Sequence, residues 1–241
     1  MLSYLLVLAI GIVAGGVGGM IGTGSSLILL PVLVYTYGPK QAVPIMAVAA
    51  VMGNMARVAA WWRVVDWKAV IAYSVPGAPA AALGARTLLS LPPSVINAAL
   101  GLFFLAMLPL RRWQARTGRR LHLWEMSLAG AVIGYLTGLV LSTGPLSVPV
   151  FISYGLTGGA FLSTEAASSL MLYVSKAATF QYLGAMPLST LLQGVIVGAS
   201  LMAGTYAGKA LLVRLSPRAI THMLDALMLC SGLSLLWAAW R

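Results

Sequence analysis

Long apolar runs alternate with short polar connections along the whole chain. The pattern predicts two sets of five apolar segments, because runs near 18 residues mark helices that span a membrane. The second member of each set is short, at about a dozen residues. The first set is 2–21, 26–37, 41–62, 68–90 and 94–110; the loop 111–123 follows; the second set is 124–141, 145–155, 161–183, 188–213 and 217–240.

The composition agrees with this pattern and excludes a soluble domain. Hydrophobic residues make up 60% of the 241 residues, charged residues 8%, and the mean hydropathy is +0.95. The apolar runs are continuous rather than alternating, which argues against a β-barrel. The first run lacks a basic flank, so we expect it to be retained rather than cleaved as a signal peptide. The sequence therefore predicts an all-α, polytopic integral membrane helical bundle.

The stretch from Gly15 to Pro31 predicts an interrupted helix. It reads GGVGGMIGTGSSLILLP. Its glycines each cost roughly 1 kcal/mol against alanine in a helix, and its hydroxyl side chains compete for backbone hydrogen bonds. We expect a break near 22–25 that lines a wet cavity, with a helix starting at Ser25 or Ser26 and aiming its N–H groups at an anion. Alternatively, the small residues only let helices pack closely.

This stretch occurs twice. Residues 134–149 read GYLTGLVLSTGPLSVP, and Thr143-Gly144 corresponds to Thr23-Gly24. Residues 46–59 also align without gaps on residues 165–178, a shift of 119 that pairs Arg57 with Lys176. The chain is thus expected to hold two repeats, 1–110 and 124–241, each with a broken or short half-helix. An odd number of elements in each repeat makes the two inverted, which suits alternating access around a midplane site.

Positive charge predicts the orientation in the membrane. The net charge is +11, and five arginines lie between 111 and 120. Basic residues favour the cytoplasmic side, so we expect the loop 111–120 to be cytoplasmic and the turns at 91–93 and 184–187 to be outside. This explains the charge without a nucleic-acid partner.

Several of these features together resemble the sulfite exporter TauE/SafE family, also called the toluene sulfonate uptake permease family. The resemblance covers nearly the whole chain and rests on the duplicated stretch ending in Pro31-Val-Leu33 and Pro149-Val-Phe151, on Val65-Asp66-Trp67, and on Gly84-Ala85-Arg86 with Leu91-Pro92. Here the denser glycine run of the family is reduced to Gly22-Thr-Gly-Ser-Ser26 and Ser142-Thr-Gly-Pro145. The resemblance implies a multi-pass carrier of the bacterial inner membrane for sulfur-containing anions such as sulfite, sulfonates or sulfoacetate.

Hydroxyl and basic side chains are the candidates for binding such an anion. Serine and threonine donate hydrogen bonds without stranding a charge, although they also bond back to their own helices. A basic residue inside an apolar helix marks a pathway unless its side chain snorkels to the interface, and both interpretations stay open for Arg57 and Lys176. The candidate substrate-binding residues are Thr23, Gly24, Ser25, Ser26, Asn54, Arg57, Ser142, Thr143, Gly144, Ser147, Tyr173 and Lys176.

The acidic residues within or beside the segments receive separate hypotheses. Asp225 lies inside the last segment and is a candidate for proton coupling, or an ion-pair partner of nearby basic residues. Glu165 follows Ser163-Thr164 at an expected helix start, where a carboxylate favours the helix dipole, so we expect it to be a cap. Asp66 lies beside Arg63 and Lys68, where structural pairing is expected.

Taken together, the residues predict a secondary transporter in which one half moves against the other. No nucleophile elbow, zinc motif or Walker A motif is present, so no enzyme activity and no cofactor are expected. The expected partners are a small anionic substrate and membrane lipid, and the size of the chain is compatible with a homodimer. A passive anion channel and a membrane subunit without transport of its own are the alternatives.

Overall fold

The computed structural model describes residues 2–21, 25–92, 120–139 and 143–211, with scattered residues between 94 and 109 and between 226 and 240. Every regular element in these ranges is helical, so the chain is an all-α protein. The elements are α1 (Leu2–Ile21), α2 (Ser25–Tyr37), α3 (Pro39–Trp61), the 3₁₀ turn η1 (Trp62–Val64), α4 (Trp67–Ser90), α6 (Leu123–Leu139), α7 (Gly144–Tyr154), α8 (Gly158–Tyr182) and α9 (Leu188–Leu211).

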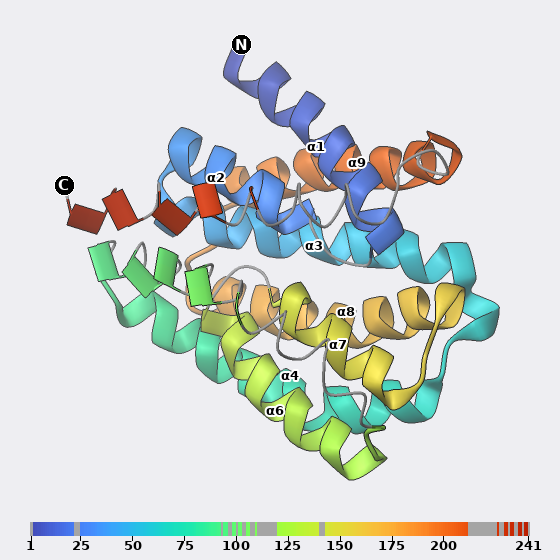
Figure 1. The fold of residues 1–241 in the computed structure, drawn as a ribbon. Helices are drawn as coiled ribbons and strands as arrows, with labels where there is room; N and C mark the ends of the chain where they lie inside the picture. Colours follow the sequence, from blue (N-terminus) through green and yellow to red (C-terminus); the bar gives the residue numbers. More distant parts are fainter. Residues whose placement is uncertain are drawn as a thin grey trace.

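Both expected interruptions separate two helices. α1 ends at Ile21 and α2 begins at Ser25, while α6 ends at Leu139 and α7 begins at Gly144. α2 packs against α1 and α7 packs against α6, so the chain reverses its direction at both places (Figure 1). Residues 22–24 and 140–142 lie outside the described residues, as do most of the two expected fifth segments.

The helices form two layers (Figure 1). α1, α2, α3 and α9 pack on one another and are called the first bundle; α4, α6, α7 and α8 pack on one another and are called the second bundle. α3 and α8 lie side by side and make the extensive contact between the two bundles. The core of each bundle is apolar, with Leu29, Ile45 and Met46 in the first and Phe151 and Phe180 in the second fully buried.

The two bundles do not coincide with the two halves of the sequence. α4 belongs to the first half of the chain but packs on α6 and α8, and α9 belongs to the second half but packs on α1 and α3. Each half therefore supplies its fourth helix to the bundle that the other half begins. The two exchanges correspond to one another. In each bundle, the first helix of one half (α1 or α6) packs against the fourth helix of the other half (α9 or α4).

Glycine permits these two exchanged contacts. A Cβ atom at Gly15 of α1 would lie 2.2 Å from the carbonyl oxygen of Leu201 in α9. A Cβ atom at Gly134 of α6 would lie 2.3 Å from the carbonyl oxygen of Gly77 in α4. Such close backbone approach is characteristic of helix packing within membranes. The packing interpretation of the small residues thus holds for these two glycines, which lie inside continuous helices rather than at the interruptions.

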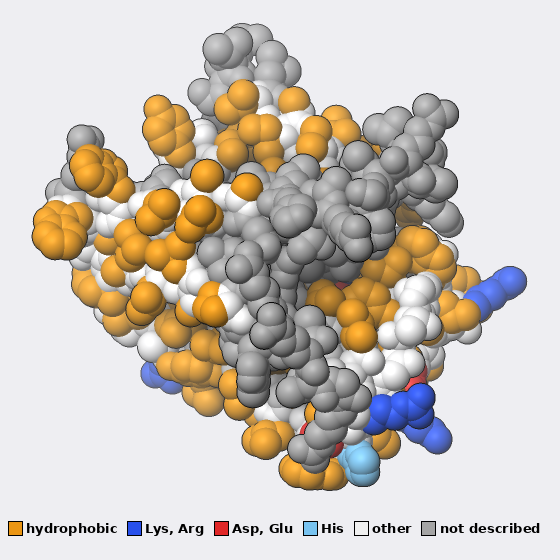
Figure 2. All heavy atoms as spheres, in the orientation of Figure 1, with side chains coloured by type: hydrophobic (Ala, Val, Ile, Leu, Met, Phe, Trp, Pro, Cys, Tyr) orange, Lys and Arg blue, Asp and Glu red, His pale blue; other side chains and the backbone are white. Residues whose placement is uncertain are grey.

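Much of the described exterior is apolar, and three of the four exposed Lys and Arg side chains of the described residues gather at one end; Arg86, in the last turns of α4, is the exception. Hydrophobic side chains cover much of the coloured part of the face in Figure 2, and Lys and Arg side chains lie mainly toward its right end. The backbone N–H of Asp66, in the η1–α4 connection, donates to the side-chain hydroxyl of Thr164 near the start of α8 at 2.9 Å, and the N–H of Leu121 donates to the carbonyl oxygen of Ser153 at the end of α7 at 2.9 Å. The exposed basic residues Arg63, Lys68 and Arg120 therefore share this end.

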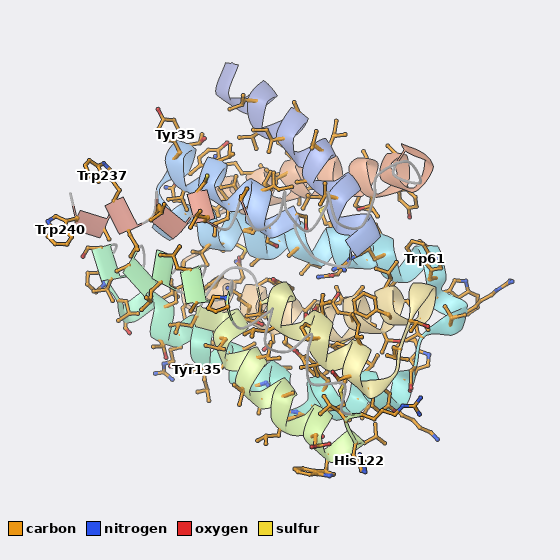
Figure 3. The ribbon with its side chains drawn as sticks, viewed as in Figure 1. Tyr35, Trp61, His122, Tyr135, Trp237 and Trp240 are labelled. Carbon is orange, nitrogen blue, oxygen red and sulfur yellow. The ribbon has the colours of Figure 1, made fainter. Side chains whose placement is uncertain are left out.

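Aromatic side chains mark both ends of the molecule. Trp61 lies at the basic end and Tyr35, Trp237 and Trp240 at the other (Figure 3). Such belts are typical of the two membrane interfaces. Two described spans, Gln41–Val64 and Leu188–Ala207, are long and apolar enough to cross a membrane.

Asp66 has a local structural role at the basic end. Its carboxylate accepts hydrogen bonds from the backbone N–H groups of Lys68 and Ala69, at 3.0 and 3.2 Å. It is therefore the N-cap of α4. The sequence predicted a structural pairing for Asp66, and the partners found here are two backbone groups and the hydroxyl group of Tyr154.

Candidate functional site

A cavity of about 40 Å³ lies between the two bundles. A space of this size has room for several water molecules. The first bundle contributes Gly15, Gly18, Ser25, Ser26, Ala50, Gly53, Asn54, Arg57, Leu201 and Thr205; the second contributes Thr143, Gly144, Glu165, Ser169 and Tyr173.

The cavity joins residues from both interruptions. Ser25 and Ser26 start α2, and Thr143 and Gly144 stand at the start of α7. The two stretches are far apart in the sequence and meet here because α3 and α8, which follow them, pack together. Thr23, Gly24 and Ser142, three further candidates, lie outside the described residues.

Arg57 is the cation of this cavity. It lies in the last two turns of α3, and only 11% of its side chain is exposed. Its Nη1 donates a hydrogen bond to Glu165 Oε2 at 2.9 Å, and its Nη2 donates to Asn54 Oδ1. The guanidinium group thus crosses from the first bundle to the second. A snorkelling role would instead extend the group toward the membrane interface.

Glu165 is the carboxylate that faces Arg57, and its assignment as a helix cap is wrong. α8 begins at Gly158, three residues earlier than expected, so Glu165 lies two turns inside the helix. Its side chain is 2% exposed. Its Oε1 accepts hydrogen bonds from Ser147 Oγ at 2.9 Å and Ser169 Oγ at 2.8 Å, while Oε2 accepts from Arg57. The carboxylate therefore binds side chains of three helices rather than backbone amides.

The hydroxyl groups of α7 donate to protein acceptors. Thr137 Oγ1 donates to the carbonyl oxygen of Ile133 at 2.7 Å, so the short contact between Thr143 Oγ1 and Thr137 Oγ1 uses the proton of Thr143. Ser147 Oγ has two acceptors within reach, Glu165 Oε1 at 2.9 Å and the carbonyl oxygen of Gly144 at 3.2 Å. Across the cavity, the side chains of Tyr173 and Ser26 are hydrogen-bonded to each other. In this structure the hydroxyl groups around the cavity are hydrogen-bonded to other groups of the protein.

Lys176 lies away from the cavity. Its side chain is completely buried, which excludes the snorkelling interpretation. Its Nζ donates to the carbonyl oxygen of Thr137 at 2.6 Å and lies 5.7 Å from the centroid of the Phe180 ring. Thr137 belongs to the last turn of α6, where carbonyl groups lack helical partners and cations are favoured. The contact is that of a C-terminal cap of α6.

The two basic residues that the repeat aligns therefore have different surroundings. Arg57 meets a carboxylate at the cavity and Lys176 meets a helix end. The residue that aligns with Glu165 is Met46, which is buried and apolar. This difference between the two repeats, a charged residue aligned with an apolar one, was the signal in the sequence that could have identified Glu165 as a site residue.

The remaining candidates divide between the cavity and the residues that are not described. Asn54 and Tyr173 line the cavity together with Arg57, while Ser147 contacts it through Glu165. Asp225 lies outside the described residues. Among the described residues, no cluster of three or more His, Cys, Asp or Glu side chains could hold a metal ion.

Comparison with known proteins identifies the family of this chain. A family model described as sulfite exporter TauE/SafE matches residues 7–235, nearly the entire chain. Neither the curated proteins nor the solved structures contain a match. The match agrees with the resemblance in the duplicated stretches. The chain belongs to the sulfite exporter TauE/SafE family, whose members are integral membrane transporters and not enzymes.

Proposed function

We propose that this protein is a secondary transporter that moves a small sulfur-containing oxyanion across the bacterial inner membrane by alternating access. One observation carries the proposal. The cavity between the two bundles brings together the starts of two interrupted helices and a buried arginine. Paired interruptions that meet at one cavity are typical of the binding sites of secondary transporters.

The chemistry of the cavity favours an anion. Helix N-termini carry partial positive charge and free N–H groups, and α2 and α7 both start at the cavity. The guanidinium group of Arg57 matches the oxygens of an oxyanion through paired hydrogen bonds. The cavity is small and lined in large part by polar groups, which suits a small oxyanion such as sulfite or the head of a sulfonate.

The moving bodies in this proposal are the two bundles rather than the two halves of the sequence. The polar contacts across the cavity, Arg57 with Glu165 and Tyr173 with Ser26, join the first bundle to the second. Rocking one bundle against the other along α3 and α8 would open the cavity to one side of the membrane at a time. The correspondence between the exchanged contacts supports two inverted repeats, 1–110 and 124–241, joined by the loop 111–123.

Transport by the purified protein tests the proposal against a channel and against a subunit without transport. Proteoliposomes that contain the protein should take up radiolabelled sulfite, and unlabelled sulfite loaded inside should accelerate the entry of label. A carrier shows this counterflow and an open pore does not. Uptake without counterflow would indicate a channel, and the absence of movement for sulfite, thiosulfate, taurine and sulfoacetate would contradict the proposed function.

Arg57→Gln is expected to weaken sulfite binding by at least about tenfold, which corresponds to ~1.4 kcal/mol. The variant removes the cation of the cavity but keeps a side chain of similar length and polarity. Arg86→Gln is the matched control, because Arg86 is an exposed arginine of α4. Thermal shift with increasing sulfite measures both. Equal loss in the two variants, or none in either, would remove Arg57 from the binding site.

A further inference from the structure

Arg57 is already paired in this structure, and that pairing constrains how an anion can bind. Its Nη1 donates to Glu165 and its Nη2 to Asn54. A substrate oxyanion that approached the guanidinium group would meet the Glu165 carboxylate there. The substrate and the carboxylate carry the same sign of charge in a cavity of about 40 Å³. The two therefore compete for one cation.

Glu165 has no other cation among the described side chains that face it. Arg57 comes from α3; the groups from the other elements are the hydroxyls of Tyr73 on α4, Ser147 on α7, and Ser169 and Tyr173 on α8. The carboxylate is 2% exposed. Losing Arg57 to an anion would leave a buried carboxylate beside a second negative charge, at a cost of several kcal/mol. Taking up a proton removes that cost.

Two buried hydroxyl groups in the interior of the second bundle lie near Glu165. The hydroxyl groups of Tyr73 and Ser168 are buried and have no hydrogen-bond partner among the described residues. Ser168 lies three residues beyond Glu165 on α8, and Ser74, the neighbour of Tyr73, contacts the carbonyl oxygen of Ser168 at 3.5 Å. Buried polar atoms without partners mark places where a water or a proton carrier fits.

We infer that Glu165 couples proton uptake to anion binding: the substrate oxyanion replaces the Glu165 carboxylate on Arg57, and Glu165 binds one proton from the solvent at the same time. The inference rests on the proposed function and names the group that carries the coupling. Nothing is oxidised or reduced. One proton enters with each anion, so a monoanion such as a sulfonate crosses with no net charge.

The uncharged state of Glu165 also loosens the contact between the bundles. The Arg57–Glu165 ion pair is a cross-bundle contact, and protonation or anion binding each remove its charge attraction. The same event that admits the substrate thus weakens a contact that holds the two bundles together. Coupled movement of the two bundles follows from one exchange of partners on Arg57.

The experiment compares the wild type with Glu165→Gln, which mimics the protonated carboxyl group, and with Glu165→Asp, which keeps the charge. Sulfite binding to purified protein is measured by thermal shift at about pH 5.5 and about pH 8, and sulfite uptake into proteoliposomes is measured with and without a pH gradient. Sulfite itself takes up a proton in this range, but this affects all variants equally. Glu125→Gln is the matched control, because Glu125 lies in the first turn of α6 beside the exposed His122.

Wild type, Glu165→Asp and Glu125→Gln are expected to bind sulfite more tightly as the pH falls. Glu165→Gln should bind at the higher pH about tenfold more tightly than wild type and change less with pH. Its sulfite uptake should lose the acceleration by a pH gradient. Acceleration that persists in folded Glu165→Gln, or wild-type uptake that never responds to the gradient, would overturn the inference and leave the transporter standing. No sulfite movement in the wild type would instead contradict the proposed function.

Discussion

At the scale of single residues, a cation inside an apolar helix needs a partner, and Arg57 and Lys176 find different ones. Their shared position in the two repeats and their location inside apolar helices were visible in the sequence. Their partners were not visible in the sequence, because each lies on a different helix. Arg57 binds the carboxylate of Glu165 in α8, and Lys176 binds the backbone carbonyl oxygen of Thr137 in α6. The sequence analysis placed Glu165 near the start of a helix that in fact begins three residues earlier. This small error in the helix start was enough to change the role expected of Glu165.

Lys176→Met is expected to lower stability and to leave sulfite binding intact. The change keeps the apolar stem and removes the hydrogen bond to the carbonyl oxygen of Thr137, and an unsatisfied buried carbonyl costs about 1–3 kcal/mol. The apparent unfolding temperature in detergent should fall, while the shift that saturating sulfite adds to it should be unchanged. Lys68→Met, at an exposed lysine near the start of α4, is the control and should change neither value. Lost sulfite binding in well-folded Lys176→Met would show that Lys176 belongs to the site.

At the scale of elements, apolar runs and glycine positions defined most of the helices. The described helices begin and end within three residues of the expected segments, because a continuous apolar run bounded by polar connections leaves little freedom in a membrane. The glycines were harder to interpret. Those of the stretch from Gly15 to Pro31 were interpreted as weakening a helix, but Gly15 lies within a continuous helix where another backbone comes close, and so does Gly134 of the matching stretch. The sequence does not distinguish a glycine that interrupts a helix from one that lets two helices pack closely. The position of the neighbouring helix does.

Gly134→Leu is expected to disrupt the α4–α6 contact. Its Cβ atom would lie 2.3 Å from the carbonyl oxygen of Gly77, a backbone group that moves only with its helix, and overpacking of this kind costs about 1–3 kcal/mol or more. After heating, size-exclusion chromatography should show less folded protein for the variant than for the wild type. Val132→Leu adds bulk on the exposed face of the same helix and should behave as wild type. A fully stable Gly134→Leu would mean that the two helices lie farther apart.

At the scale of the whole molecule, the arrangement combines two halves that exchange their fourth helices. Each bundle contains helices from both halves, and the cavity lies where the bundles face each other. Three of the four exposed basic residues that the structure describes lie at one end, and aromatic residues lie at both ends, which gives the molecule an axis (Figures 2 and 3). Positive charge favours the cytoplasm, so the axis carries an expected direction.

Cysteine labelling in intact cells tests this direction. In a background with Cys230→Ser, Arg120→Cys should be protected from a membrane-impermeant maleimide, because the basic end is expected to be cytoplasmic. Leu183→Cys, at the exposed turn that follows α8, should react. After the cells are broken open, both should react, which controls for access. If only Arg120→Cys were labelled in intact cells, the protein would have the opposite orientation in the membrane.

The sequence by itself determined that the chain is a helical membrane protein, where its described helices lie and between which helices the two interruptions fall. These properties are local: they follow from the length of apolar runs, the residues between them and the match of one stretch with another. Only the tertiary structure decided that α4 and α9 change bundles, that Arg57 meets Glu165 and that Lys176 caps α6. Contacts between helices depend on which faces meet and at what depth. In a chain that is apolar on nearly every face, the residue pattern alone does not specify them.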